Sequence, residues 1–415
     1  MKIDEFGTWT VVAAYEGDAT HRPARSKGVP ITIKAWLGEV VVSQLRTSGP
    51  AGAGDYYVEI TNTGRGSVRL AGFTLVSGSG TRTVLPYYAP FLGTGKRYLA
   101  TGKAFSLGGV ATPDLTGYLG NGGFTIIAPD EAGTVTDAVG PVTGPHRGRP
   151  LPTVSGTTST QWAFVRATRG GRVVDTGQNA DDFALVPADG GKVGGVQSMR
   201  GSASPAGLLD PVRSNDFAQS SLLDPDVAAG ALPNRRYVPG TPARLEIRRM
   251  ITNTSTRSIT RVKVRVTSLS EADGLPYPGG SQPAVPARLR LVAPATATTT
   301  VTLADRSTVN VQNLRPDPPA SAASGGGLNS TLTVPLPYGP VSPGDSVWVS
   351  FTFEVDVRGT YWFGYDVEAL TKYYPGGSRT TAPVPSVRRA AAVERPAARD
   401  GSRSAAVAPL VRGTL

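Results

Sequence analysis

The chain has 415 residues, of which 51 are glycine and 35 are proline, and this density of helix-breaking residues excludes a fold built from long helices. It contains no cysteine and only two histidines, which excludes disulfide frameworks, thiolate catalysis and cysteine-ligated zinc or iron–sulfur sites. With 39% hydrophobic and 18% charged residues, the composition is that of packed domains, and the length allows about two to four of them.

The formal net charge is +11, and a basic chain raises the question of nucleic acid. Seven arginines lie between residues 376 and 415, a stretch without aromatic side chains for base stacking, so nucleic acid is disfavoured as a partner. Elsewhere the basic residues alternate with apolar ones, as Arg261, Lys263 and Arg265 do with three valines. We expect these three to lie on a solvated outer face of a strand.

Alternation of apolar and polar residues with a period of two predicts β-strands along most of the chain. The clearest run is 347–357, with apolar residues at every odd position, which is typical of a half-buried antiparallel strand. Shorter runs separated by turn-forming clusters are 8–14, 29–35, 40–45, 56–61, 124–127, 245–251, 261–267, 289–292, 300–303 and 360–367. The pattern predicts an all-β fold of tandem immunoglobulin-like sandwiches.

The strands group into segments. Residues 1–36 hold two strands, residues 37–200 a first sandwich and residues 243–374 a second one. The stretch 201–242, rich in serine, aspartate, proline and alanine, is interpreted as a connector with some local structure. Residues 375–415 lose the alternation, and their alanine, arginine and proline content predicts a disordered tail.

Motifs that carry chemistry are scarce. The adjacent Asp181 and Asp182 would point to opposite faces of a strand, and both His21 and His146 stand in loop contexts without a second histidine nearby. Asp224 and Asp226 flank a proline and leave a calcium site open as an alternative to a plain turn. We therefore predict no enzyme, with no catalytic, cofactor-binding or metal-ligating residues.

The first sandwich resembles a known family in several motifs taken together. These are the strand at 40–49, the strand Asp55-Tyr-Tyr-Val-Glu59-Ile-Thr-Asn62, Gly72-Phe73-Thr-Leu75, Asp137-Ala-Val-Gly140 and Asn179-Ala-Asp-Asp182-Phe. In this order and spacing the segment resembles a bacterial lamin tail domain, although the family usually has tryptophan where Phe73 stands. The resemblance implies an immunoglobulin-like sandwich used for binding and scaffolding, without catalytic residues. We assign Glu59 and Asn62 to hydrogen bonding at a strand end.

The flanking segments resemble extracellular bacterial modules. Residues 7–34 are similar to the last two strands of a bacterial immunoglobulin-like repeat, and residues 210–370 are more loosely similar to terminal modules of large secreted proteins. Two strands cannot bury a core alone. We favour the hypothesis that a longer secreted protein, with a signal peptide upstream, contains this chain as its C-terminal part. The alternative is that the two strands dock on the first sandwich as an extra hairpin.

Three functions remain. The leading hypothesis is a non-enzymatic extracellular or cell-surface protein, whose sandwiches serve as spacers and as adhesion or binding units for an unknown protein or polysaccharide. The alternative is an accessory carbohydrate-binding module of a secreted hydrolase. It would need exposed aromatic side chains, for which the candidates are Trp36, Tyr87, Tyr88, Trp348 and Trp362. The third is nucleic-acid binding through the arginine-rich tail. No stretch is apolar enough to span a membrane.

Overall fold

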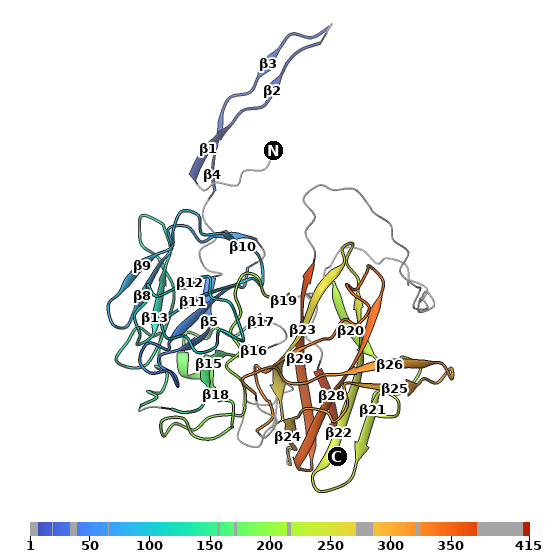
Figure 1. Cartoon of the computed structure of the whole chain (residues 1–415). Coiled ribbons are helices and arrows are strands. Elements are labelled where there is room, and N and C mark those ends of the chain that lie inside the picture. Colours follow the sequence, from blue (N-terminus) through green and yellow to red (C-terminus); the bar gives the residue numbers. More distant parts are fainter. Residues whose placement is uncertain are drawn as a thin grey trace.

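The computed structural model describes residues 7–18, 20–33, 40–64, 66–155, 158–169, 172–213, 217–270, 285–320, 324–371 and 410–415. Within these ranges the secondary structure is almost entirely β, and a single helix appears, the one-turn α1 (Asn179–Asp182). Two β-bodies lie side by side, and a narrow hairpin extends away from them (Figure 1). The predicted all-β fold is confirmed.

The first body is a sandwich of a six-stranded and a four-stranded sheet. In spatial order the six-stranded sheet contains β12 (Leu115–Thr116), β11 (Arg97–Thr101), β6 (Tyr57–Asn62), β5 (Val40–Arg46), β15 (Trp162–Arg166) and β18 (Phe183–Pro187). The other contains β14 (Val135–Val139), β13 (Phe124–Ile127), β8 (Thr74–Ser77) and β9 (Arg82–Val84). Two short pairs accompany them, β7 (Val68–Arg69) with β10 (Phe91–Leu92) and β16 (Thr168–Arg169) with β17 (Arg172–Val173).

The six-stranded sheet is buried on both faces. Its inner face packs against the four-stranded sheet, with Ile60 and Phe164 in the same apolar cluster as Phe124 of β13. Its outer face carries a second cluster that includes Tyr57 and Val186. All six residues of β6 are consequently buried, whereas a sandwich exposed on its outer faces would bury every second one.

The second body is also a sandwich of two sheets. One contains β19 (Val212–Arg213), β29 (Thr360–Thr371), β23 (Ile259–Leu269) and β27 (Thr331–Thr333), with β30 (Leu410–Thr414) paired to β29 as well. The other contains β20 (Ala218–Leu222), β22 (Ala243–Asn253), β28 (Ser346–Val357), β26 (Thr308–Asn313) and β25 (Thr298–Thr302). In that sheet β21 (Arg235–Val238) also pairs with β22, and β24 (Arg288–Leu291) with β28.

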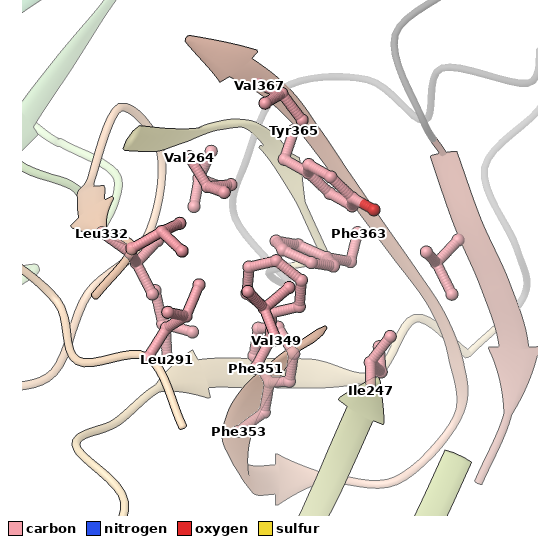
Figure 2. Close-up of a cluster of buried hydrophobic side chains, with 14 of the residues drawn as sticks. Ile247, Val264, Leu291, Leu332, Val349, Phe351, Phe353, Phe363, Tyr365 and Val367 are labelled. Atoms are coloured by element: carbon pink, nitrogen blue, oxygen red, sulfur yellow. The ribbon is translucent and has the colours of Figure 1, made fainter. Parts of the chain in front are cut away.

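Aromatic rings fill the centre of the second sandwich (Figure 2). Phe351 and Phe353 of β28 meet Phe363 of β29 edge to face, with ring centroids 5.0 and 4.9 Å apart, and Tyr365 stacks on Phe363 at 5.1 Å. These positions are two apart along each strand, so the alternation seen in the sequence places them on the inner faces. Val357 departs from the predicted inward row and is 41% exposed, because it lies at the end of β28.

The N-terminal hairpin is narrow. β1 (Gly7–Val11) pairs with β4 (Val29–Ile33), and beyond them β2 (Ala14–Tyr15) pairs with β3 (Ala24–Arg25). Within the described residues neither pair joins a sheet of the first body. Tyr15 and Val29 are exposed, so these two apolar side chains do not dock on the sandwich.

Two predicted boundaries differ from the structure. The stretch 201–242, interpreted as a connector, supplies the strands β19, β20 and β21, so the sheets of the second body begin before residue 243. Of the predicted disordered tail at 375–415, residues 375–409 lie outside the described residues, while 410–414 form β30. The tail prediction is therefore wrong for its last residues, because edge pairing with β29 orders a segment whose composition alone would not fold.

The two bodies contact each other through backbone hydrogen bonds. Gly201, at the exit of the first body, and Leu328, in the second, form a short parallel bridge, in which Ser202 N donates to Leu328 O at 2.9 Å and Leu328 N to Arg200 O at 3.0 Å. A Cβ on Gly201 would collide with Leu328 O and would lie 2.6 Å from Val186 Cβ. Glycine is required here because the approach leaves no room for a side chain.

Replacing Gly201 with valine should therefore separate the bodies without unfolding either core. We expect small-angle X-ray scattering to show a larger radius of gyration, and limited proteolysis to cut faster near residue 201. The matched control is Gly230→Val, because a Cβ at Gly230 meets no atom within 4 Å. Unchanged scattering by the Gly201 variant would contradict the required close approach.

Candidate functional site

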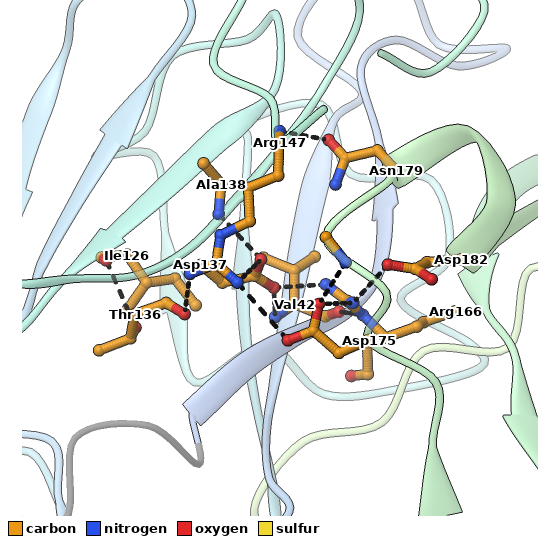
Figure 3. A network of polar contacts seen from close by, with 12 residues as sticks. Val42, Ile126, Thr136, Asp137, Ala138, Arg147, Arg166, Asp175, Asn179 and Asp182 are labelled. Atoms are coloured by element: carbon orange, nitrogen blue, oxygen red, sulfur yellow. Dashed lines mark hydrogen bonds and ion pairs between the residues drawn. The ribbon is translucent and has the colours of Figure 1, made fainter. Parts of the chain in front are cut away.

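Three of the five motifs of the family resemblance, at 40–49, 137–140 and 179–182, meet at a buried ionic cluster in the first body (Figure 3). Asp137 accepts hydrogen bonds from Arg166 Nη2 at 2.5 Å and from the backbone nitrogens of Val42 and Ala138 at 2.9 Å. Arg166 Nη1 also lies 3.6 Å from Asp182 Oδ2. Burial raises the pKa of Asp137, and the Arg166 charge opposes this. These contacts join β5, β14, β15 and α1, so the motif residues hold the sandwich together.

The two adjacent aspartates at 181–182 are not on a strand as predicted. They lie in the single helical turn α1. Asp182 is buried and accepts hydrogen bonds from Thr176, whereas the more exposed Asp181 pairs with Arg149 at the surface. The expected opposite faces of a strand therefore do not apply, although the two carboxylates do have separate partners.

A second ionic cluster joins the two bodies. The Glu368 carboxylate, on β29, accepts a hydrogen bond from Arg97 Nη2 of the first body at 2.7 Å. Arg265 of β23 binds the same carboxylate with Nε at 2.7 Å and Nη2 at 3.3 Å. Arg265 Nη1 in turn donates to Asn329 Oδ1 at 2.8 Å, and Asn329 Nδ2 donates to Gln44 of the first body at 3.3 Å. The network thus crosses the interface twice.

The charges of this cluster compensate one another inside the protein. Burial by itself would raise the pKa of Glu368, but Arg265 and Arg97 outweigh it and hold the pKa at about 2, below the ordinary value of 4.5. Glu368 is therefore ionised throughout the neutral range. A carboxylate that bridges two guanidinium groups in this way fixes the relative position of the elements that supply them.

The outer face of β23 corrects the sequence prediction. Arg261 is exposed as expected, but Lys263 is half-buried and Arg265 is buried, because the first body covers this part of the strand. The alternation predicted correctly that the basic residues leave the core of their own sandwich. It could not indicate that a second sandwich would cover them.

Glu59 and Asn62 have different roles. Asn62 matches the assignment to a strand end, since its Nδ2 donates to Gly66 O at 2.7 Å and to Leu92 O at 2.6 Å. Glu59 instead lies at the interface, where Oε2 accepts from Ala206 N at 2.7 Å and Oε1 lies 3.6 Å from Arg97 Nε. For Glu59 the strand-end assignment is wrong, because the outer face of β6 is covered.

The open calcium alternative and the histidines fall on turns. The carboxylate of Asp224 accepts backbone hydrogen bonds from Asp226 N at 3.1 Å and Ala304 N at 2.7 Å. His21 Nδ1 lies 3.0 Å from Asp18 in the exposed hairpin, and His146 Nδ1 is 2.8 Å from Gly144 O. Across the described ranges no three histidine, aspartate or glutamate side chains gather as a metal site would require.

The five aromatic residues that are candidates for carbohydrate binding differ in how exposed their side chains are. Trp362 is buried, Trp348 is half-buried, and Trp36 lies outside the described residues. Tyr87 and Tyr88 are 82% and 75% exposed on the loop between β9 and β10, with ring centroids 5.4 Å apart and ring planes at 80°. Phe91, at the start of β10, is exposed as well. We name Tyr87, Tyr88 and Phe91 the tyrosine loop, which is our candidate functional site.

The other surface features do not point to a particular chemistry. An open hollow of about 310 Å³ lies on the second body between residues 260–263 of β23 and residues 333–336. The basic side chains of Arg261 and Lys263 line it together with aliphatic and threonine side chains. In the part of the chain that the structure describes, no helix has the length and apolar character to cross a membrane.

Comparison with known proteins gives no family for this chain. No family model matches the sequence, and no curated protein matches it at a significant level.

Glu368→Gln should remove the charge that the two arginines share. Because the pKa of Glu368 is lower in the folded chain than the unfolded value of 4.5, its contribution is complete above pH 4.5 and disappears as the pH falls toward 2. We expect the variant to lose about 3 kcal/mol near pH 7 and to approach the wild type at low pH. Urea unfolding at several pH values measures this difference.

The matched control is Glu131→Gln, which changes an exposed glutamate. It should alter the free energy of unfolding by less than about 0.5 kcal/mol. A Glu368→Gln deficit that does not change with pH would contradict the ionic role.

Proposed function

We propose that this chain is a non-enzymatic modular protein of an extracellular or cell-surface assembly, in which the two sandwiches form one rigid spacer and the tyrosine loop is a contact unit. The observation that carries the proposal is the Glu368 carboxylate bridging Arg97 and Arg265 across the interface. A spacer needs fixed geometry between its bodies, and buried ion pairs with the backbone contact at Gly201 supply it.

The use of charged side chains supports this proposal. Catalytic acids and bases must reach a substrate in a cleft. Here Asp137, Arg166 and Glu368 are buried and bind one another or neighbouring arginines. The buried pair Arg46 and Asp55 has the same character. The most conspicuous exposed side chains are aromatic, and such residues are favoured at binding surfaces.

The extracellular location and the lamin tail assignment belong to the same proposal. The resemblance of the motifs at 55–62, 137–140 and 179–182 supports both. Their residues meet at structural contacts of the first sandwich, as expected of a scaffolding domain.

The alternative function, carbohydrate binding by a module of a secreted hydrolase, is favoured by one observation. Tyr87 and Tyr88 are adjacent, exposed and close enough to contact one ligand together. Their rings are nearly perpendicular, however, whereas a flat crystalline polysaccharide needs a coplanar platform. The loop geometry therefore favours a folded protein surface or a twisted soluble glycan.

Rigidity is measured with one spin label on each body, at Glu131→Cys and Thr302→Cys, because the chain has no other cysteine and both sites are exposed. Electron paramagnetic resonance should give one narrow distance distribution that added salt does not broaden. The doubly labelled Gly201→Val variant is the flexible reference. A distribution as broad as that reference, or a hydrolase activity of the purified chain on polysaccharide substrates, would contradict the spacer proposal.

Changing Tyr87 and Tyr88 together to alanine should reduce binding at the loop by at least tenfold, because buried aromatic anchors dominate contact energies. A glycan array and a pull-down with insoluble polysaccharide give the affinity for sugars. The matched control is Tyr338→Ala, which removes a tyrosine that is 69% exposed on the second body. If neither assay detects sugar binding by the wild type, the carbohydrate alternative is eliminated.

A further inference from the structure

The edge of β29 contains a slot that is filled by a distant part of the chain. β30 pairs antiparallel with residues 360–364 of β29, with Thr414 opposite Thr360 and Leu410 opposite Gly364. β23 occupies the opposite edge of β29, and β19 pairs further along the same edge, at Glu368 and Ala369. Among the described residues, β30 completes the edge of β29 at residues 360–364, and we call this edge position the slot.

The slot selects for a particular sequence. Val411 is buried in the aromatic core of the second body, and Leu415 packs against the same core. A Cβ on Gly413 would lie 2.7 Å from the ring of Tyr361, which is buried. Arg412 and Thr414 are exposed. The slot thus accepts an extended segment of the pattern Val-x-Gly-x-Leu, which is the form of recognition that strand addition uses.

The connection to β30 is much longer than the slot requires. The 38 residues from 372 to 409 separate the end of β29 from the start of β30. Fully extended, they would span about 130 Å. Returning from Thr371 to a point beside Gly364 needs only about 24 Å, which is seven residues of strand. A connection of this length allows β30 to reach the slot of its own chain or that of a neighbouring copy.

We propose that the slot on β29 takes β30 from a second copy of this chain, so that neighbouring copies are joined by exchange of this strand. Every contact of the slot is the same whether β30 belongs to the same chain or to another, so exchange costs no pairing or packing. Only the effective concentration differs, and a linked strand has a local concentration in the millimolar range. The fraction of exchanged strands therefore increases with the concentration of chains, as on a crowded surface. This inference goes beyond the proposed spacer role because exchange links neighbouring spacers.

The register permits a clean test. Leu415 N donates to Gly359 O at 3.0 Å, which makes positions 359 and 415 a hydrogen-bonded pair and the adjacent Thr360 and Thr414 a non-hydrogen-bonded pair. The Cβ atoms of such a pair are close, and this geometry suits a disulfide. Because the chain has no cysteine, each substitution introduces the only thiol.

The experiment mixes two full-length single variants, Thr360→Cys and Thr414→Cys, under oxidised glutathione. We expect a covalent heterodimer whose yield increases with protein concentration up to about 0.1 mM, which is still below the millimolar local concentration of a linked strand. The control mixture replaces Thr360→Cys with Thr302→Cys, an exposed position on β25, and should give at least tenfold less heterodimer. Gly413→Val in the Thr414→Cys chain should suppress the product to the control level.

A double variant, Thr360→Cys with Thr414→Cys, tests the slot within one chain. At protein concentrations far below the local concentration of a linked strand, it should form an internal disulfide and remain monomeric. Heterodimer at the control level, while the double variant closes internally, would overturn strand exchange. Failure of the double variant to close would overturn the slot itself, and a heterodimer that survives Gly413→Val would overturn its sequence selectivity.

Discussion

The second body covers the outer face of the six-stranded sheet of the first body, and the other contacts between the bodies follow from this burial. The six-stranded sheet of the first body has polar groups on its outer face, among them Glu59 and Arg97, and the facing sheet of the second body carries Arg265 and Glu368. Transferring any one of these charged groups from water into the interface without a partner would cost free energy. Together they neutralise one another, and Glu368 binds both arginines. The interface is therefore ionic at its centre and specific in its geometry.

The same constraint explains the glycine at position 201 and the apolar cluster around Tyr57. Close backbone contact between residues 200–202 and Leu328 closes the interface beside the ionic cluster and keeps water away from it. Low water access strengthens the attraction between the charges. Packing and electrostatics therefore support each other, and the two sandwiches act as one unit from which the hairpin and the tyrosine loop extend.

Interior and exposed side chains of the described residues have different roles. Polar side chains in the interior serve architecture, as Asp137 does for the first sandwich and Asn62 for its loop. The exposed tyrosine loop lies on the first body, and the strand slot on β29 lies in the second. The proposed spacer and the proposed strand exchange therefore use different parts of the molecule, the first the interface between the bodies and the second the edge of β29.

Alternation along the chain is enough to predict the longer strands and their inner faces, but it did not indicate the strands β19, β20 and β21. Alternation placed Val262, Val264 and Val266 in a core, because side chains on a strand point to opposite faces in turn. The composition, which contains no cysteine, also excludes thiol chemistry. What covers the other face of a strand depends on the packing of the two bodies. Arg265 follows the same alternation as Arg261, yet Arg265 is buried and Arg261 is exposed. Strand periodicity is a local property, whereas burial of an outer face depends on a partner body that is distant in sequence.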